Sequence, residues 1–87
     1  MHGRAIEYYE NALKSDIETF GEDHPNVAIR LNNLGEVWRA KGEYDRAIEY
    51  FEKALSVFRL RLGNDHPSTK LVETNLSLAK KEKLESK

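Results

Sequence analysis

The chain has 87 residues, of which 39% are hydrophobic and 33% charged, and its formal net charge is −1. This length allows one small domain, and the composition is typical of a folded helical chain rather than a disordered one. The balanced charge offers no basic face for nucleic acid, and the lack of cysteine excludes disulfides and thiolate metal sites. No apolar run reaches the roughly 18 residues of a membrane span. We therefore expect a cytoplasmic protein that binds neither nucleic acid nor membrane.

The sequence predicts four helices, at about 4–20, 25–41, 44–62 and 67–84, joined by short turns and without strands. Each has apolar residues three or four positions apart, the spacing of one helix face. Gly21 and Gly63 suit the position just past a helix end, while Pro25 and Pro67 suit the first turn of the next helix. The predicted fold class is therefore all-α.

The first and third helices share a repeated sequence. RAIEYYENAL begins at Arg4 and RAIEYFEKAL at Arg46, while GEDHP begins at Gly21 and GNDHP at Gly63, so both motifs recur at the same interval along the chain. A fixed period of about 20 to 50 residues is typical of a solenoid, in which each unit buries its apolar face against its neighbours. We therefore expect two equivalent corners in successive units.

The corners place a histidine beside an acid, which raises the question of a metal or acid–base site. His24 and His66 each precede a proline and are expected just before a helix, where the neighbouring aspartate can accept hydrogen bonds from free N–H groups. A zinc ion usually needs three or four ligands, so a metal shared between two corners is the less favoured alternative. We expect structural corners and no bound metal or other cofactor.

No catalytic motif is present, since the chain lacks a glycine-rich phosphate loop, a G-x-S-x-G elbow and an H-E-x-x-H pair. Glutamates do occur in pairs three positions apart, at Glu7 and Glu10 and again at Glu49 and Glu52. Their recurrence in both units favours a solvated outer face over paired acid–base carboxylates. We do not expect an enzyme.

Residues of the second and third helices resemble the tetratricopeptide repeat, a helix-turn-helix unit: Leu31, Leu34, Gly35, Trp38, Gly42, Tyr44, Ala47, Phe51 and Ala54. In that family small residues stand where the two helices touch, which implies a close contact between Gly35 and Ala47. The unit in this chain is longer than the usual one, and with its LG-x-DHP corner it is similar to the repeat of kinesin light chains. The resemblance implies a right-handed solenoid.

The resemblance also sets the phase of the repeat. In the family the first helix of a unit, A, lines the concave face and the second, B, lies outside, which gives this chain the order B-A-B-A and makes it a fragment of a longer array. The A-helix positions implied to bind an extended peptide or partner protein are Ile29, Asn32, Asn33, Glu36, Arg39, Leu71, Thr74, Asn75 and Leu78. Asn33 and Asn75 are one period apart and would form a ladder of amides facing the peptide backbone.

The helix at 4–20 suggests a second function, self-assembly. The A helix that would cover part of its apolar stripe is absent, which favours a homodimer through this helix, and the stripe consists of Ile6, Tyr9, Leu13 and Ile17. In the last helix, Glu73 and Lys80 replace Leu31 and Trp38, so that end is predicted to be a polar cap. The sequence leaves both functions open: a protein-interaction scaffold or a self-assembly module.

Overall fold

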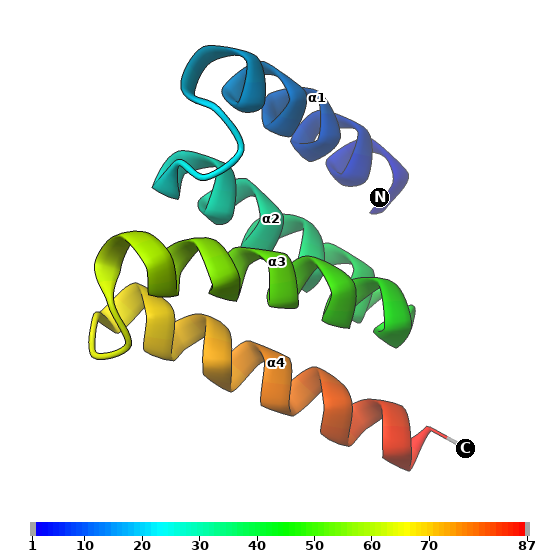
Figure 1. The fold of residues 1–87 in the computed structure, drawn as a ribbon. Coiled ribbons are helices and arrows are strands. Elements are labelled where there is room, and N and C mark those ends of the chain that lie inside the picture. The colour runs from blue at the N-terminus through cyan, green and yellow to red at the C-terminus, as the bar shows by residue number, and fades with distance from the viewer. Residues whose placement is uncertain (1, 87) are drawn as a thin grey trace.

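The computed structural model describes residues 2–86, which form four helices (Figure 1). These are α1 (His2–Phe20), α2 (Pro25–Ala40), α3 (Tyr44–Leu62) and α4 (Pro67–Glu85). No strand occurs within residues 2–86, so the predicted all-α class is confirmed. The ends differ slightly from the predicted ones: α1 begins earlier, α2 ends at Ala40 and α4 continues to Glu85. Terminal turns carry few hydrogen bonds, and sequence patterns place them least well.

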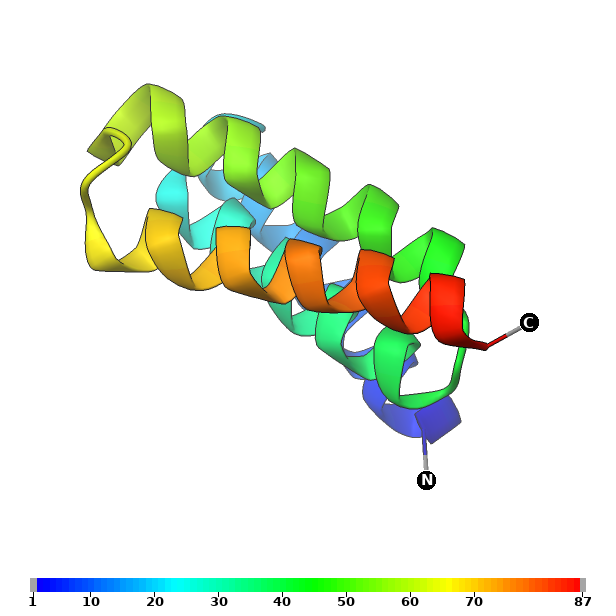
Figure 2. The ribbon, with the colours of Figure 1, turned by 90° about the horizontal axis from the view of Figure 1, so that it is seen from below.

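Helices that follow each other in the chain pack against each other, and α2 also contacts α4. Figure 1 shows α1 and α4 at opposite ends of the stack with α2 and α3 between them, and Figure 2 shows α4 beside α3 from another side. The stack is flat, with extents of 39 × 31 × 15 Å. Among the described residues, the backbone of α1 approaches that of α2 alone. This arrangement exposes a large share of each helix.

The turn between α1 and α2 and the turn between α3 and α4 each begin with a glycine in a backbone conformation that favours glycine. Gly21 has φ of 91° and Gly63 has φ of 87°, a region that side chains disfavour. The N–H of Gly21 donates to the carbonyl of Ile17 at 2.9 Å, and that of Gly63 donates to the carbonyl of Phe58 at 3.2 Å. These bonds satisfy carbonyls that a helix end otherwise leaves unpaired. The chain then turns and starts the next helix at proline.

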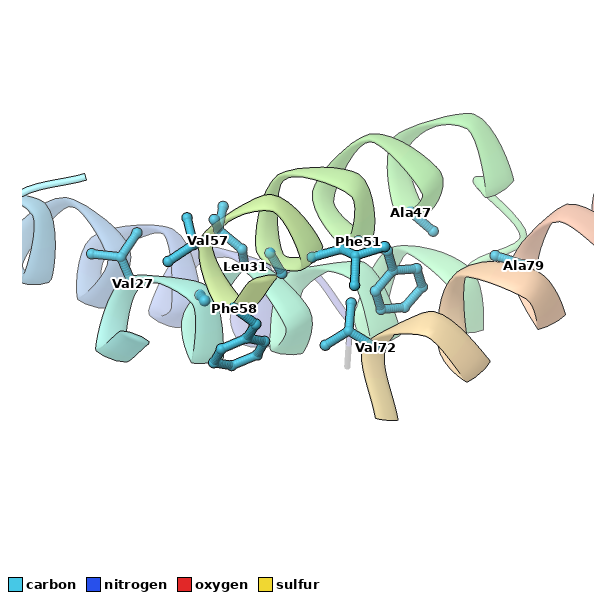
Figure 3. Packing of buried hydrophobic residues seen from close by; sticks show 11 residues of the cluster. Val27, Leu31, Ala47, Phe51, Val57, Phe58, Val72 and Ala79 are labelled. Carbon is cyan, nitrogen blue, oxygen red and sulfur yellow. The ribbon is translucent and has the colours of Figure 1, made fainter. Parts of the chain in front are cut away.

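The core lies where α2, α3 and α4 meet, around the fully buried Phe51 (Figure 3). Its buried members are Val27, Ala28, Leu31, Ala47, Phe51, Ala54, Leu55, Val57, Phe58, Val72 and Ala79. Gly35 allows α2 to approach α3 closely, since a Cβ atom at this position would lie 2.5 Å from the ring of Phe51. The predicted partner of Gly35 was Ala47, but the nearest atoms belong to Phe51, because its ring reaches across to α2. The close contact between α2 and α3 thus depends on the packing of the Phe51 ring against Gly35.

Candidate functional site

The seam between α2 and α4 is held by polar pairs. Asn75 donates from Nδ2 to Oδ1 of Asn32 at 3.0 Å, and both side chains are buried. Further along, Nη1 of Arg39 donates to Oε1 of Glu82 at 3.2 Å. Amide groups buried without partners would be costly, so the Asn32–Asn75 bond fixes the register of the two helices.

The seam explains which predicted peptide-binding residues are available to a ligand. Asn32 and Asn75 are used inside the fold, and Arg39 is engaged by Glu82. Of the two members of the predicted amide ladder, Asn75 turns into the seam, and Asn33 remains half-exposed. Asn75 points toward α2, the A helix of the preceding unit. The spacing of residues along α4 did not show whether Asn75 points toward α2 or toward the surface that a ligand would contact.

The remaining predicted residues lie beside the seam. Ile29, Leu71 and Leu78 are exposed, with 47%, 55% and 40% of their surfaces accessible. The spacing of three and four positions within each helix keeps them on one face. We call this surface the α2–α4 face, and it consists of Ile29, Asn33, Glu36, Leu71, Thr74 and Leu78. It combines three exposed aliphatic side chains with hydrogen-bonding groups.

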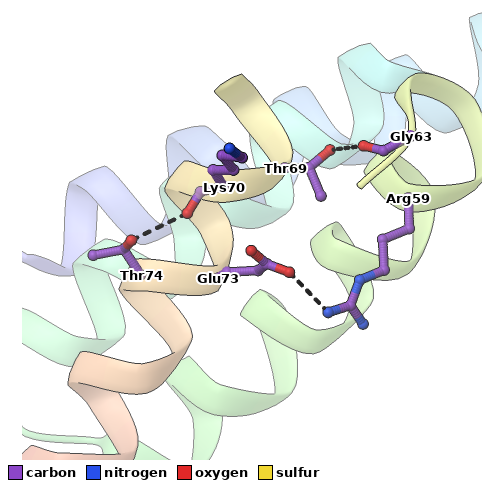
Figure 4. Close-up of polar contacts among 6 residues, drawn as sticks. All are labelled: Arg59, Gly63, Thr69, Lys70, Glu73 and Thr74. Carbon is purple, nitrogen blue, oxygen red and sulfur yellow. Dashed lines mark hydrogen bonds and ion pairs between the residues drawn. The ribbon is translucent and has the colours of Figure 1, made fainter. Parts of the chain in front are cut away.

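A shallow pocket on α4 adjoins this face. It has a volume of about 380 Å³ and is lined by Glu73, Thr74, Ser77, Leu78 and Lys81. The hydroxyl of Thr74 donates to the carbonyl of Lys70 at 3.1 Å (Figure 4), which leaves oxygen lone pairs facing solvent. Leu78 gives the pocket an apolar wall, and Glu73 and Lys81 give it one negative and one positive charge.

The predicted self-association stripe on α1 is divided by the fold. Ile6 is only 8% exposed, so it is buried within the chain. Leu13 and Ile17 are half-buried and pack against the core, while Tyr9 is half-buried beside the exposed Tyr8. The stripe does not form one exposed surface, because α1 packs against α2.

Leu13 and Ile17 instead form one wall of a groove between α1 and α3. The groove has a volume of about 500 Å³, and we call it the α1–α3 groove. Its lining residues are Leu13, Ile17, Glu22, Asp23, Val27, Leu31, Tyr50, Lys53, Ser56 and Val57. The sequence analysis identified none of Tyr50, Lys53 and Ser56 as site residues, because no motif marks them and only the packing of three helices brings them together.

Tyr50 links the two walls of the groove. Its hydroxyl donates to Oε2 of Glu10 on α1 at 3.4 Å. Burial raises the pKa of Tyr50 above its ordinary value of 10.0; the charge of Glu10 and this hydrogen bond raise it further, while Arg46 lowers it. The phenol therefore stays protonated over a wider pH range and remains a donor to Glu10.

The histidine corners act as helix caps. Nδ1 of His24 accepts from the N–H of Asn26 at 3.0 Å, and Nδ1 of His66 accepts from the N–H of Ser68 at 3.0 Å. The predicted acceptor was the neighbouring aspartate, but the imidazole itself caps each helix, because the extended backbone before proline directs it over the first turn. Among residues 4–86, whose side chains the structure describes, no group of three or more His, Cys, Asp or Glu could hold a metal ion.

The comparisons with known proteins agree with this fold. The profile described as tetratricopeptide repeat matches the chain twice, over residues 1–59 and 31–84. The chain belongs to the tetratricopeptide repeat family. Repeats of this family are generally protein-interaction scaffolds and typically non-catalytic. No curated protein matches the chain. None of the four helices, as far as the structure describes them, is long and apolar enough to cross a membrane.

Proposed function

We propose that the chain is a non-catalytic scaffold whose α2–α4 face binds an extended peptide or a partner protein. The observation that carries this proposal is the exposure of Ile29, Leu71 and Leu78 on one face of two adjacent helices. Large aliphatic side chains that gather on a surface usually mark an interaction site. We also propose that the chain is cytoplasmic, as expected of a chain without cysteine. Its repeat is proposed to be related to the longer repeat of kinesin light chains.

The polar members of the face suit a peptide backbone. Asn33 offers an amide donor and acceptor, and Thr74 offers hydroxyl lone pairs, next to the aliphatic side chains. A bound peptide loses hydrogen bonds to water, so polar groups that replace them limit the cost of binding. Glu36 adds a negative charge at the edge of the face, which favours a ligand with a basic residue there.

The experiment begins with selection of a ligand from a displayed library of random peptides, followed by calorimetric titration of the selected peptide. We expect Leu71→Glu and Leu78→Glu each to weaken binding by about tenfold or more, roughly 1.4 kcal/mol, since each places a charge in an apolar contact. Leu60→Glu is the matched control, because Leu60 is 69% exposed on α3, outside the face. Equal affinity for all three variants contradicts the proposal.

Self-association through α1 is the second candidate function. It is favoured by Tyr8, which is 64% exposed and packs edge-on against Tyr9 with ring centroids 5.4 Å apart. Two such aromatic pairs related by a twofold axis would form a self-complementary contact. Sedimentation velocity of the wild-type chain and a Tyr8→Glu variant tests this candidate. A dimer that the variant abolishes supports it, and a wild-type chain that stays monomeric at millimolar concentration refutes it.

A further inference from the structure

The α1–α3 groove is separate from the α2–α4 face. Its floor includes Val27 and Leu31 of α2, whereas Ile29 and Asn33 of the same helix belong to the α2–α4 face. Residues two positions apart on a helix point about 200° from each other, so the two surfaces lie on different sides of α2. A ligand in the groove therefore leaves the α2–α4 face accessible.

Two aliphatic residues of the groove do not recur in the next unit. Ile17 and Leu31, which both line the groove, are replaced one period later by Arg59 and Glu73. There the two side chains form an ion pair with 3.0 Å between Nη2 and Oε2 (Figure 4). This ion pair is exposed, with 50% and 40% of the two side chains accessible, whereas Leu31 is buried beneath the groove. The aliphatic pair therefore belongs to the covered interface of this groove and not to the exposed end of the stack.

Charge is arranged asymmetrically along the groove. Glu22 and Asp23 lie in the turn after α1, both exposed, while Lys53 stands on the α3 wall. Arg61 donates from Nε to the backbone carbonyl of Asp23 at 3.0 Å, not to its carboxylate. Among the ion pairs formed by the side chains of residues 4–86, none includes Glu22 or Asp23. Two unengaged carboxylates therefore border the apolar floor at one end.

We propose that the α1–α3 groove binds a short amphipathic segment of a partner protein. Aliphatic side chains of this segment contact Leu13 and Ile17, and a lysine or arginine at one end pairs with Glu22 and Asp23. The volume of about 500 Å³ lies within the roughly 300 to 1,000 Å³ of ordinary ligand pockets. An amphipathic helix in an apolar groove is an established mode of peptide recognition, and its basic end fixes the orientation. This site is independent of the proposed function of the α2–α4 face.

The test uses a fluorescein-labelled synthetic peptide, about four helical turns long, with leucines at helical spacing and two arginines at one end, measured by fluorescence polarisation. Two control peptides carry glutamates in place of the arginines or the same leucines out of register. The groove variant is Ile17→Arg with Leu13→Glu, which places charges on the two half-buried aliphatic residues of the α1 wall. Leu71→Glu is the control variant on the α2–α4 face.

We expect the groove variant to weaken binding of the arginine peptide about tenfold or more, with Leu71→Glu unchanged from wild type. Glu22→Lys with Asp23→Lys is expected to weaken the arginine peptide about fivefold and to leave the glutamate peptide no weaker than in wild type. If circular dichroism shows that the groove variant is unfolded, Ser56→Arg replaces it. Ser56 is exposed on the α3 wall, so its substitution obstructs the groove without disturbing the core.

Three results would overturn the proposal. The first is no saturable binding of the arginine peptide up to millimolar concentration. The second is binding that Leu71→Glu abolishes while the groove variant keeps it, which assigns the peptide to the α2–α4 face. The third is a wild-type dimer, seen by sedimentation without peptide, that the groove variant dissociates, which makes a second copy of the chain the occupant.

Discussion

The amide of Asn75 donates to the side-chain oxygen of Asn32 across the seam between α2 and α4, with 3.0 Å between the two atoms. Both residues are buried, with 8% and 9% of their surfaces accessible. A hydrogen bond in this position connects the A helices of successive units and aligns the exposed residues beside them. The geometry of the α2–α4 face therefore depends on a contact that a ligand does not reach.

Substitution of one member of this pair should destabilise the fold. Asn75→Ala leaves the amide of Asn32 buried without its partner, and we expect a loss of about 1 to 3 kcal/mol in the free energy of unfolding. Asn32→Leu combined with Asn75→Leu removes both polar groups and should be closer to wild type than the single variant. Urea denaturation of the variants measures both effects. An unchanged midpoint for Asn75→Ala would mean that the seam bond contributes nothing.

Gly35→Ala should also destabilise, although alanine is the better helix former. The added Cβ atom would meet the ring of Phe51 at 2.5 Å, and because this ring is fully buried, either the ring or the helix must shift within the core. Overpacking of this kind costs about 1 to 3 kcal/mol, more than the roughly 1 kcal/mol that alanine gains over glycine within a helix. Thermal unfolding followed by circular dichroism measures the net effect.

A second substitution checks the cause. Phe51→Leu removes ring atoms that the new methyl group would meet, so Gly35→Ala should cost less in that background than in wild type. Equal costs in the two backgrounds would show that Phe51 does not limit the approach of α2 to α3.

The histidine caps are expected to contribute to stability through their own side chains. His24→Ala and His66→Ala each remove an acceptor for a helix N–H, and we expect a loss of about 1 kcal/mol in each case. Asp23→Ala and Asp65→Ala are the matched controls, since the imidazole occupies the capping position beside each of them. Chemical denaturation compares the four variants. Larger losses for the aspartate variants would return the capping role to the carboxylates.

Tyr50 predicts a dependence of stability on pH in the alkaline range. Its pKa in the folded chain is raised above the ordinary 10.0 by burial and by Glu10. A raised pKa contributes stability that is fully present below the unfolded value and is lost as pH rises through the folded value. We therefore expect the free energy of unfolding to fall more steeply above about pH 10 in wild type than in Tyr50→Phe. Urea denaturation at a series of pH values on both sides of this point gives both slopes, and parallel slopes would contradict the role of Tyr50.

The helices could be predicted because local rules determine them. Gly21 and Gly63 occupy backbone conformations that favour glycine, and Pro25 and Pro67 begin helices, so the sequence marks both corners directly. Because the sequence repeats, helices and turns predicted in one unit are also predicted at the equivalent positions of the next. The polar seam, by contrast, required knowledge of which side of each A helix meets its neighbour.

Two parts of the candidate sites could not be predicted from the pattern. Ile6 has the same apolar character as Leu13, yet only Ile6 is covered by the fold while Leu13 lines a groove. The groove itself depends on α1 and α3 standing apart over α2, a distance that no residue spacing encodes. The pattern therefore identifies apolar faces but does not determine how much of each face the neighbouring helices cover.

The most direct test of the central claim, that the α2–α4 face binds a ligand, is a methyl-resolved NMR titration with the library-selected peptide. The methyl groups of Ile29, Leu71 and Leu78 report on this face, and those of Leu13 and Ile17 report on the α1–α3 groove. We predict that the largest shift changes occur at Ile29, Leu71 and Leu78. Shift changes confined to Leu13 and Ile17, or no specific changes at a saturating concentration of peptide, would contradict the claim.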